Sequence, residues 1–338
     1  MNKKICFFCV GTGGHVLPVK NLINELKELG TKSEDIFVIS DNRGKQYLDN
    51  LDINIHTPEI FVSKKGMLGY IFNVFRILRS IKTISKILKN QNISVVFTTG
   101  AYVAPVAAII SRILKAKFFI QEQNIYAGLG NKLSAIFAET IFTSFEDTQN
   151  INQNKIKHTG PVVNTTLTRK DIDSVEIQTI GFIGGSQGSE EINSYVEQFL
   201  KSEVQANFDI VHITGKTKNN PKLDRQNYKS YEFFNDMDNF YNNVDILVGR
   251  AGGGSLEAAY LGIPQIVIPY KHGTTSSHQD LNARYIEKKN FGFKVNSFNE
   301  LLSKLSDISL KIKSSNLDMP KIEIGNQSIA KEIYEHIN

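Results

Sequence analysis

Short apolar runs alternate with segments of helical periodicity along the whole chain of 338 residues. In the first half, the apolar runs predict strands at 4–10, 36–40, 53–57, 94–98, 117–121 and 140–144. Between them, apolar residues recur with a helical period and predict helices over 16–29, 67–90, 103–114 and 128–137. Strands that alternate with helices in this way are typical of an α/β fold with parallel sheets.

The alternation is interrupted once, at Gly160 and Pro161, where a polar stretch begins that runs to residue 175. Because a chain of this length is too long to fold around a single hydrophobic core, two domains are expected. We predict an N-terminal domain over 1–158, a linker over 159–175, a C-terminal domain over 176–325 and a last helix over 326–338 that can pack back on the first domain. The second half predicts strands at 179–183, 208–213, 228–232, 244–248 and 265–269, and helices at 189–201, 253–261 and 277–289.

Composition places the chain among ordinary globular proteins, with 41% apolar and 22% charged residues. No run reaches the ~18–20 apolar residues of a membrane-spanning helix. The apolar run after Lys4 is too short for a signal peptide, so we expect a cytoplasmic protein. Cys6 and Cys9 lie on one expected strand and face opposite sides, which favours buried thiols over a redox pair.

Charge is divided unevenly between the two halves. Residues 1–158 carry 20 Lys and Arg against 12 Asp and Glu, whereas residues 159–338 carry 19 against 22. Residues 60–121 include ten basic residues and no acidic one. This asymmetry predicts an anionic partner for the first half, which can be nucleic acid, phospholipid or a pyrophosphate compound. Compositional drift in a sequence rich in Lys, Asn and Ile is the alternative.

One glycine-rich turn in each half follows an expected strand and opens a helix. The first consists of Gly11, Thr12, Gly13, Gly14 and His15, and the second includes Gly184, Gly185, Ser186, Gln187 and Gly188. Such a turn allows backbone N–H groups and the positive end of a helix to approach an anion. Neither turn is a strict GxGxxG, but two in corresponding positions predict two Rossmann-like domains that face a cleft.

A third turn of this kind spans residues 250–257 and contains Gly252 and Gly253. It is equally suited to a phosphate beside a helix N-terminus. Glu257 lies one helical turn further on, where its carboxylate can accept two hydrogen bonds from a ribose diol. The alternative is a carboxylate that only compensates the helix dipole.

Amide side chains follow the last expected strand of the second half, at the edge where ligands bind in open α/β sheets. Gln279 and Asn282 are three residues apart and share a helix face. Neutral amides suit sugar hydroxyls, which need both donors and acceptors. His272 and His278 lack a recognisable ligand spacing with Asp or Cys, so we predict no metal site.

Two further loops of the first half are expected at the same sheet edge. Residues 121–131 are rich in amides and include Asn124, and residues 98–105 include Gly100 and Tyr102. His15 is the best-placed titratable group, because an ordinary imidazole suits general-base chemistry near neutral pH. The alternative is a histidine that only holds the loop by hydrogen bonding.

The segment 64–89 combines apolar and basic residues in a way that predicts contact with a membrane surface. Its first turns are apolar on nearly all sides, and basic residues follow. The residues that we assign to this contact are Met67, Leu68, Phe72, Phe75, Arg76 and Arg79. An apolar patch with a basic rim is typical of interfacial contacts with anionic lipid. The alternative is an ordinary crossover helix with a solvated basic side.

Taken together, the motifs resemble those of the MurG family of glycosyltransferases, which have the GT-B fold. The resemblance rests on six segments in the family's order, VGTGGHVLPV, GAYVAP, QEQNIYAGLGN, GGSQGSEEIN, RAGGGSLEAAYLGIP and IPYKHGTTSSHQDLNARYIE, which span nearly the whole chain. The family transfers GlcNAc from UDP-GlcNAc to the C4 hydroxyl of undecaprenyl-pyrophosphoryl-MurNAc-pentapeptide (lipid I), with inversion and without a metal. The product is lipid II of peptidoglycan synthesis, made on the cytoplasmic face of the cell membrane.

The resemblance implies a role for each motif. It implies that Glu257 holds the ribose, that His15 is the candidate base and that no cofactor is needed. Further donor contacts are implied for Ser186, Gln187, Gly188, Gly252, Gly253, His278, Gln279, Asn282 and Asn124. Acceptor contacts are implied for Thr12, Gly13, Gly14, Gly100 and Tyr102. The chain departs from the family pattern at Gln121, at Val163 and in the 250–257 turn, which is one residue shorter.

Three alternatives remain open on the sequence. The first is a GT-B enzyme that glycosylates diacylglycerol or another lipid. The second is an NAD(P)-dependent oxidoreductase, for which Asp41 at the end of the second strand would bind the ribose. The third is a non-catalytic protein that binds membrane or nucleic acid, which explains the basic stretch but not the glycine turns.

Overall fold

The chain is divided into two compact units. Unit 1 comprises Met1–Val162 and Ile324–Asn338, and unit 2 comprises Val163–Glu323. The computed structural model describes residues 3–59, 67–170, 178–217, 221, 225–270, 276–314 and 317–338, and for residues 67–74, 205–206 and 276–277 it describes the backbone alone. The division falls within the range 159–175 that the sequence indicates for the linker, part of which lies outside the described residues.

Unit 1 is built on a parallel sheet of seven strands among the residues described. They are β1 (Lys4–Phe8), β2 (Ile36–Ile39), β3 (Asn54–His56), β4 (Ile93–Thr98), β5 (Lys117–Glu122), β6 (Thr140–Thr143) and β7 (Ile156–His158). Its helices are α1 (Gly13–Glu28), α2 (Asn42–Lys45), α3 (Met67–Leu88), α4 (Ala104–Leu114), α5 (Leu129–Ser134) and α11 (Asn326–Ile337), and the 3-10 turns are η1 (Ser33–Asp35), η2 (Ala101–Val103), η3 (Ala135–Phe137) and η4 (Gln153–Lys155). The sequence-based prediction omitted β7 and α2, which are three and four residues long.

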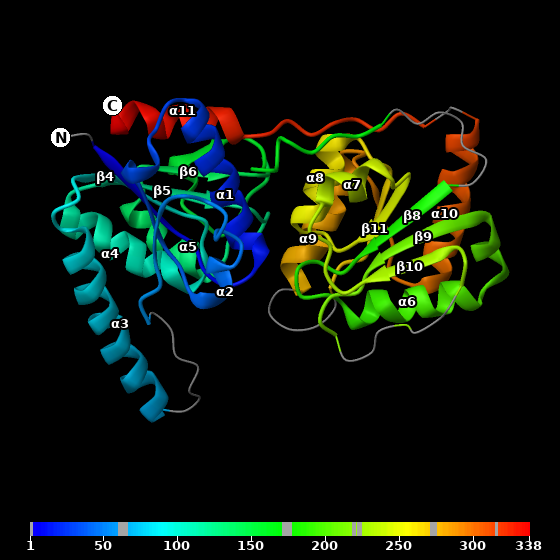
Figure 1. The fold of residues 1–338 in the computed structure, drawn as a ribbon, viewed down its shortest axis with the longest axis horizontal. Helices are drawn as coiled ribbons and strands as arrows, with labels where there is room; N and C mark the ends of the chain where they lie inside the picture. Colours follow the sequence, from blue (N-terminus) through cyan, green and yellow to red (C-terminus); the bar gives the residue numbers. More distant parts are fainter. Residues whose placement is uncertain are drawn as a thin grey trace. The chain divides into compact units, whose positions relative to one another are not determined.

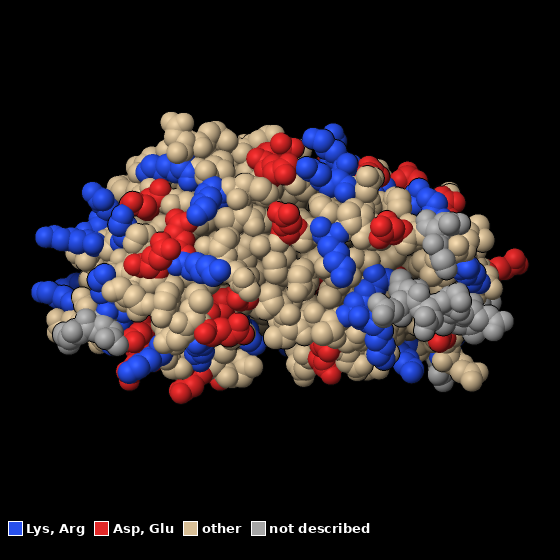
Figure 2. Space-filling view, turned by 90° about the horizontal axis from the view of Figure 1, so that it is seen from above, with Lys and Arg blue, Asp and Glu red and all other residues tan. Residues whose placement is uncertain are grey.

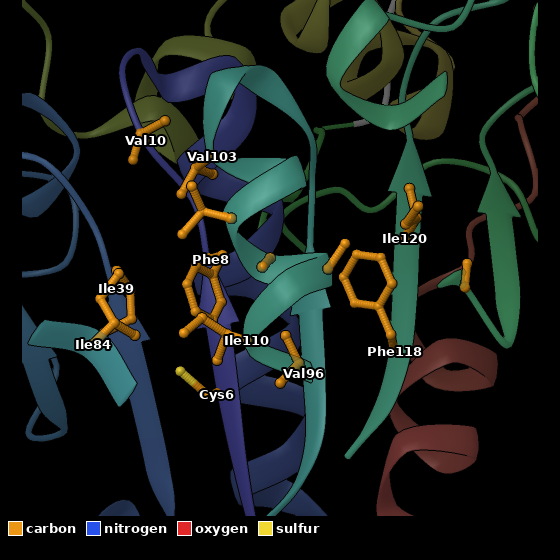
Figure 3. Packing of buried hydrophobic residues seen from close by; sticks show 14 of the residues in the cluster. Cys6, Phe8, Val10, Ile39, Ile84, Val96, Val103, Ile110, Phe118 and Ile120 are labelled. Atoms are coloured by element: carbon orange, nitrogen blue, oxygen red, sulfur yellow. The ribbon is translucent and has the colours of Figure 1, made fainter. Parts of the chain in front are cut away.

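Alternate residues of β1 and Cys9, which directly follows it, enter two separate cores, one on each face of the sheet. Cys6 and Phe8 pack with residues of α3 and α4 (Figure 3), whereas Phe7 and Cys9 pack with α1 and α11. Both cysteines are free and buried, as expected from their spacing. The C-terminal helix α11 contacts α1 and β4, so the last residues of the chain complete the core of the first unit (Figure 1).

Unit 2 is built on a parallel sheet of six strands among its described residues. They are β8 (Gln178–Ile183), β9 (Phe208–Ile213), β10 (Tyr228–Tyr231), β11 (Ile246–Gly249), β12 (Gln265–Val267) and β13 (Phe293–Lys294). The helices are α6 (Glu190–Lys201), α7 (Met237–Asn242), α8 (Gly253–Leu261), α9 (Ser276–Lys288) and α10 (Phe298–Lys313), with the 3-10 turn η5 (Glu203–Asn207). The elements β13, α7 and α10 are absent from the sequence-based prediction.

Helix α10 carries a clear sequence signal that the prediction did not use. Ser297 caps the helix by accepting a hydrogen bond from the N–H of Glu300, while a carboxylate oxygen of Glu300 accepts one from the N–H of Asn296. Leu301, Leu305, Ile308 and Ile312 are spaced for one helix face, and all four are buried in the core of unit 2. A capping residue followed by such a face is a helix signature.

Strand order places the glycine turns of each unit side by side. The orders are β3-β2-β1-β4-β5-β6-β7 and β10-β9-β8-β11-β12-β13. In each sheet the strand order reverses between two adjacent strands, β1 and β4 in unit 1 and β8 and β11 in unit 2. The carboxyl ends of strands at such a switch point are where open α/β sheets bind ligands. The two sheets thus confirm the α/β class and position both pairs of turns for binding.

On the face of the described chain shown in Figure 2, Lys and Arg are interspersed with Asp and Glu. Among the helices that the structure describes, none combines the length and hydrophobicity needed to span a bilayer.

Candidate functional site: paired loops at the two switch points

In unit 1, His15 joins the turns that follow β1 and β4. Its Nδ1 lies 3.0 Å from the carbonyl oxygen of Thr99, and the Thr99 hydroxyl donates to the carbonyl oxygen of His15 at 2.6 Å. Because a carbonyl oxygen only accepts, Nδ1 must carry the hydrogen, and Nε2 then has the free lone pair. Within the described residues, Nε2 has no hydrogen-bond partner. The imidazole both holds a loop and presents a basic nitrogen.

Asp41 ties the same turns together from the end of β2. Its Oδ1 accepts hydrogen bonds from the N–H groups of Gly11 (2.9 Å) and Gly44 (2.8 Å), and its Oδ2 accepts one from the Tyr102 hydroxyl (3.1 Å). Burial opposes ionisation, but these donors and Arg43 outweigh it and hold the pKa of Asp41 below its usual range. Burial and the Asp41 charge raise the pKa of Tyr102 to about 12. The sequence prediction gave Asp41 no such role.

Glu122 organises the amide-rich loop after β5. The side chain is 3% exposed, and its Oε1 accepts from the main-chain and side-chain nitrogens of Asn124 at 2.9 and 3.2 Å. Its Oε2 accepts from the Gly128 N–H at 3.1 Å and from Asn131 Nδ2 at 2.8 Å. Asn131 in turn lies against Gly100, where an added Cβ would stand 2.9 Å from its Nδ2. The loop at residues 121–131 therefore packs against the loop at residues 98–105, which is itself bonded to the turn that contains His15.

In unit 2, the turn after β8 presents exposed polar groups at the switch point. Ser186 and Gln187 are exposed and form no hydrogen bond within the residues described. Gly188 has a φ of +77°, a region that favours glycine, and its N–H bonds the carbonyl oxygen of Gly185 at 2.9 Å. The turn leads into α6, which carries Glu190 and Glu191 in its first turn.

Arg250 is a buried cation that connects three segments of unit 2. One terminal nitrogen donates to Glu191 Oε2 (2.8 Å) and to the carbonyl oxygen of Ile268 (3.0 Å), and the other donates to the Ser189 hydroxyl (2.6 Å). Its guanidinium also lies over the Tyr270 ring, 5.2 Å from the centroid. Because only a guanidinium offers this number of donors in a fixed plane, Arg250 neutralises Glu191 and fixes the turns after β8, β11 and β12 together. No site role for Arg250 was predicted from the sequence.

The N-terminus of α8 is open and free of negative charge. Nothing lies within 4 Å of the position that a Cβ would take at Gly252 or Gly253, and the first turn holds no acidic residue. Exposed N–H groups at such an end attract anions. Of the glycine turns in unit 2, this one offers the better electrostatic environment for a diphosphate.

Glu257 is the fifth residue of α8, and it pairs with Tyr241 rather than with the helix end. The Tyr241 hydroxyl donates to Glu257 Oε2 at 2.8 Å, and Oε1 has no partner among the described groups. Burial raises the pKa of Glu257 to about 7, although the bond from Tyr241 lowers it in part. The carboxylate is therefore held on one oxygen and available on the other, and it does not cap the helix.

The amide residues of α9 face the same turns. Gln279 Oε1 accepts a hydrogen bond from the Tyr270 N–H at 3.0 Å. Asn282 is 3% exposed, and its Nδ2 donates to the carbonyl oxygen of Ala251 at 3.2 Å. His278 is half-buried, and His272 lies outside the described residues. Gln279 and Asn282 thus support the turns after β11 and β12; whether they also contact a sugar stays a prediction.

The residues predicted for membrane contact lie on α3. Phe75 is 67% exposed, and Arg76 and Arg79 are exposed beside it. The side chains of Met67, Leu68 and Phe72 lie outside what the structure describes. Farther along, Ile84 and Leu88 are buried against α4, so the helix is anchored at its C-terminal end.

In the ranges described, no three His, Cys, Asp or Glu side chains are grouped closely enough to bind a metal ion.

Comparisons with known proteins bear first on the fold. Residues 5–143 match the glycosyltransferase family 28 N-terminal domain, and residues 179–337 match the glycosyltransferase family 28 C-terminal domain. MurG from Acinetobacter baumannii has a crystal structure that is similar with a TM-score of 0.72 and 21% identity, covering 98% of this chain and 99% of that one. The UDP-GlcNAc 2-epimerase of Neisseria meningitidis, bound to UDP-GlcNAc, is similar with a TM-score of 0.65 and 14% identity, covering 99% of each chain. At these identities both structures show the fold alone.

Sequence relatives decide the family. A protein of Thermosipho melanesiensis is 30% identical over 334 residues, which cover 96% of this chain and 96% of the relative. It is named UDP-N-acetylglucosamine–N-acetylmuramyl-(pentapeptide) pyrophosphoryl-undecaprenol N-acetylglucosamine transferase. The chain belongs to the MurG family of glycosyltransferases. A MurG relative of the same name from Listeria monocytogenes is 32% identical and covers 83% of this chain and 82% of its own length. The family and the GT-B fold class expected from the motifs are both confirmed.

Proposed function

We propose that the chain transfers GlcNAc from UDP-GlcNAc to the C4 hydroxyl of undecaprenyl-pyrophosphoryl-MurNAc-pentapeptide, with inversion, to form lipid II. One observation carries the proposal, namely 30% identity over 96% of the chain to a relative named for this reaction. The loops described above supply the chemistry that the reaction needs, which is anion binding in both units and a basic nitrogen in unit 1.

The donor is assigned to unit 2. The open N-terminus of α8 takes the diphosphate, with Ser186, Gln187 and Gly188 on the neighbouring turn. Oε1 of Glu257 accepts a hydrogen bond from the ribose, since Oε2 is occupied by Tyr241. His278, Gln279 and Asn282 are assigned to the GlcNAc hydroxyls, and from unit 1 Asn124 is assigned to the same sugar. These assignments follow the family motifs.

The acceptor is assigned to unit 1, where Thr12, Gly13, Gly14, Gly100 and Tyr102 surround the switch point of the sheet. As the acceptor oxygen attacks the anomeric carbon of GlcNAc, His15 Nε2 takes its proton. The bond between the anomeric carbon and the phosphate oxygen breaks, and UDP leaves with the electron pair. Backbone N–H groups at the α8 end stabilise that developing charge, because they are already oriented before the reaction begins.

The test is transfer of radiolabelled GlcNAc from UDP-GlcNAc to a short-chain lipid I analogue. We expect transfer by the wild type and its loss in His15→Ala and Glu257→Ala. His158→Ala is the matched control, since His158 Nδ1 also lies near a carbonyl oxygen, that of Thr143, at 3.2 Å, yet it is exposed at the sheet edge. Transfer to diacylglycerol instead of the analogue would contradict the proposal, as would full activity in His15→Ala.

Membrane association is proposed to occur through α3, which makes the chain a peripheral protein of the cytoplasmic face. Phe75 and Leu78 are 67% and 56% exposed, and Arg76 and Arg79 are available for anionic lipid. Figure 1 shows the N-terminal half of α3 projecting past α4 in unit 1. An exposed apolar patch with basic neighbours inserts into an interface and holds lipid phosphates at its rim.

Sedimentation with phosphatidylglycerol vesicles tests this contact. The double variant Phe75→Asp, Leu78→Asp should remain in the supernatant and keep transfer activity toward a water-soluble acceptor analogue. Leu310→Asp is the control, because Leu310 is equally exposed at 68% but lies on α10 of unit 2. Unchanged sedimentation of the double variant would remove α3 from the proposal.

The oxidoreductase alternative loses its main support in unit 1. Asp41, the residue expected to bind a cofactor ribose, has both carboxylate oxygens occupied by Gly11, Gly44, Tyr102 and Arg43. Fluorescence titration with NADH tests this directly, and we expect no saturable binding.

A further inference from the structure

A chain of buried hydrogen bonds in unit 2 is not used by the reaction as assigned above. His212, at the end of β9, is fully buried, and its two ring nitrogens lie 3.0 Å from the Tyr228 hydroxyl and 3.0 Å from Asn193 Oδ1. Asn193 Nδ2 continues the chain to the carbonyl oxygen of Thr214 (3.3 Å) and to the Thr217 hydroxyl (2.7 Å). Three elements, α6, β9 and β10, are connected through one imidazole.

The donor and the acceptor of each hydrogen bond follow from the last bond of the series, which ends at Thr214. The Thr214 carbonyl oxygen only accepts, so the amide nitrogen of Asn193 faces it and the amide oxygen faces His212. His212 Nε2 therefore carries the hydrogen and donates to Asn193, and Nδ1 of the neutral ring accepts from Tyr228. Burial lowers the pKa of His212 to about 4, which keeps the ring neutral at physiological pH.

The loop at residues 214–217, which accepts these hydrogen bonds, packs closely against the glycine turn at residues 184–188. A Cβ on Gly215 would lie 2.3 Å from Gly188 Cα, and a Cβ on Gly188 would lie 2.4 Å from the Thr214 carbonyl oxygen. Both glycines have positive φ, +69° and +77°. Two backbones in such close contact cannot shift independently, so whatever fixes residues 214–217 also fixes the turn at 184–188.

We propose that His212 is a positioning residue for the donor, which acts through Asn193 and the 214–217 loop to fix the 184–188 turn beside the diphosphate at the α8 end. This inference rests on the proposed function for the identity of the ligand. It differs from a merely structural role of the histidine, which would change stability without changing the turn. Removal of the ring nitrogens leaves Asn193 Oδ1 and the Tyr228 hydroxyl buried without these partners, and the loop then moves to regain them.

The experiment compares four variants of the full chain. His212→Phe keeps an aromatic ring beside Phe182 and Tyr228 but removes both hydrogen bonds. His212→Gln restores a donor toward Asn193, and Tyr228→Phe removes only the outer bond. Phe208→Leu is the control, since Phe208 begins β9 at the other end of the strand and packs only in the core.

Two measurements are made on each variant. The first is amide hydrogen exchange at residues 184–188 and 214–217 without ligand, and the second is the Kd for UDP-GlcNAc by calorimetry. We expect faster exchange in both loops of His212→Phe and about tenfold weaker binding, given the usual effect of unsatisfied buried polar groups. His212→Gln should recover most of the affinity, Tyr228→Phe should be intermediate, and Phe208→Leu should lower the unfolding midpoint with unchanged Kd and loop exchange.

Unchanged exchange at 184–188 in His212→Phe would overturn the inference, and so would loss of affinity in equal measure in Phe208→Leu. Failure of the wild type to bind UDP-GlcNAc would instead contradict the proposed function. In that case the exchange rates alone decide whether His212 fixes the turn, because they are measured without ligand.

Discussion

The Tyr102 hydroxyl donates a 3.1 Å hydrogen bond to Asp41 Oδ2, and this contact joins the turn after β4 to the loop after β2. The other Asp41 oxygen holds the Gly11 turn after β1. A single carboxylate therefore sets the spacing of the loops at the switch point of unit 1, although it stands beside a site assigned to a pyrophosphate. Arg43, at 3.2 Å from Oδ2, offsets that negative charge.

Asp41→Asn should reduce the free energy of unfolding by about 1–2 kcal/mol, because an amide cannot accept all the bonds that the carboxylate accepts. The KM for the acceptor should rise while the Kd for UDP-GlcNAc stays the same. The folded-state pKa of Asp41 is depressed, so its stabilisation is complete above the unfolded pKa of about 3.9 and is lost as pH falls through the folded value. Chemical denaturation against pH measures this, with the exposed Asp49→Asn as control.

The Tyr241–Glu257 pair predicts opposite pH dependences for stability and donor binding. The pKa of Glu257 is raised to about 7. Between about pH 4.5 and 7, its carboxyl group is therefore protonated in the folded state and ionised in the unfolded chain. Stability should therefore fall as pH rises from about 4.5 to about 7, by roughly 3 kcal/mol, since one pKa unit corresponds to about 1.4 kcal/mol. Affinity for UDP-GlcNAc should rise over the same interval, because the ribose hydroxyls donate to the ionised carboxylate. Glu257→Gln should remove the pH dependence of both stability and affinity. If stability and affinity of the wild type changed in the same direction with pH, the assignment would be contradicted.

Glu122→Gln should disorder the amide-rich loop of unit 1. The carboxylate accepts four hydrogen bonds from Asn124, Gly128 and Asn131, and a glutamine would direct its own donors at some of them. We expect the free energy of unfolding to fall by about 2–3 kcal/mol and most transfer activity to be lost, with binding of UDP itself retained. Glu139→Gln is the control, because the Glu139–Lys117 pair is exposed and worth under about 1 kcal/mol. Equal effects of the two substitutions would contradict the assigned importance of the loop.

Alanine at two glycines of unit 2 should separate folding from binding. Gly188→Ala places a methyl group 2.4 Å from the Thr214 carbonyl oxygen at positive φ, so we expect destabilisation of about 2 kcal/mol or more. Gly253→Ala projects into open space, so stability should change by less than about 0.5 kcal/mol. Its methyl group covers the α8 end, however, and should weaken UDP-GlcNAc binding about tenfold or more, as loss of hydrogen bonds to a charged group does. Thermal unfolding and calorimetry check both expectations, and wild-type affinity in Gly253→Ala would remove the diphosphate from this helix end.

Much of the fold was predictable because its signals are local. The apolar run of β1 and the glycines that follow it require only neighbouring residues to be recognised, and so does the turn at Gly252 and Gly253. The family motifs are likewise continuous segments of sequence. Even α10 was recognisable from its Ser297 cap and apolar face, although the prediction omitted it.

The sequence by itself determined the α/β class, the glycine turns and the family. Tertiary structure decided the long-range partners of Asp41, Arg250 and His212, whose hydrogen bonds reach residues 16 to 61 positions away. Sequence spacing carries no record of such contacts, because they arise only when the parallel sheets bring segments that are distant in the sequence side by side. A charged group or an imidazole can be buried only where such distant partners form hydrogen bonds with it, so its role can be recognised only in the folded structure.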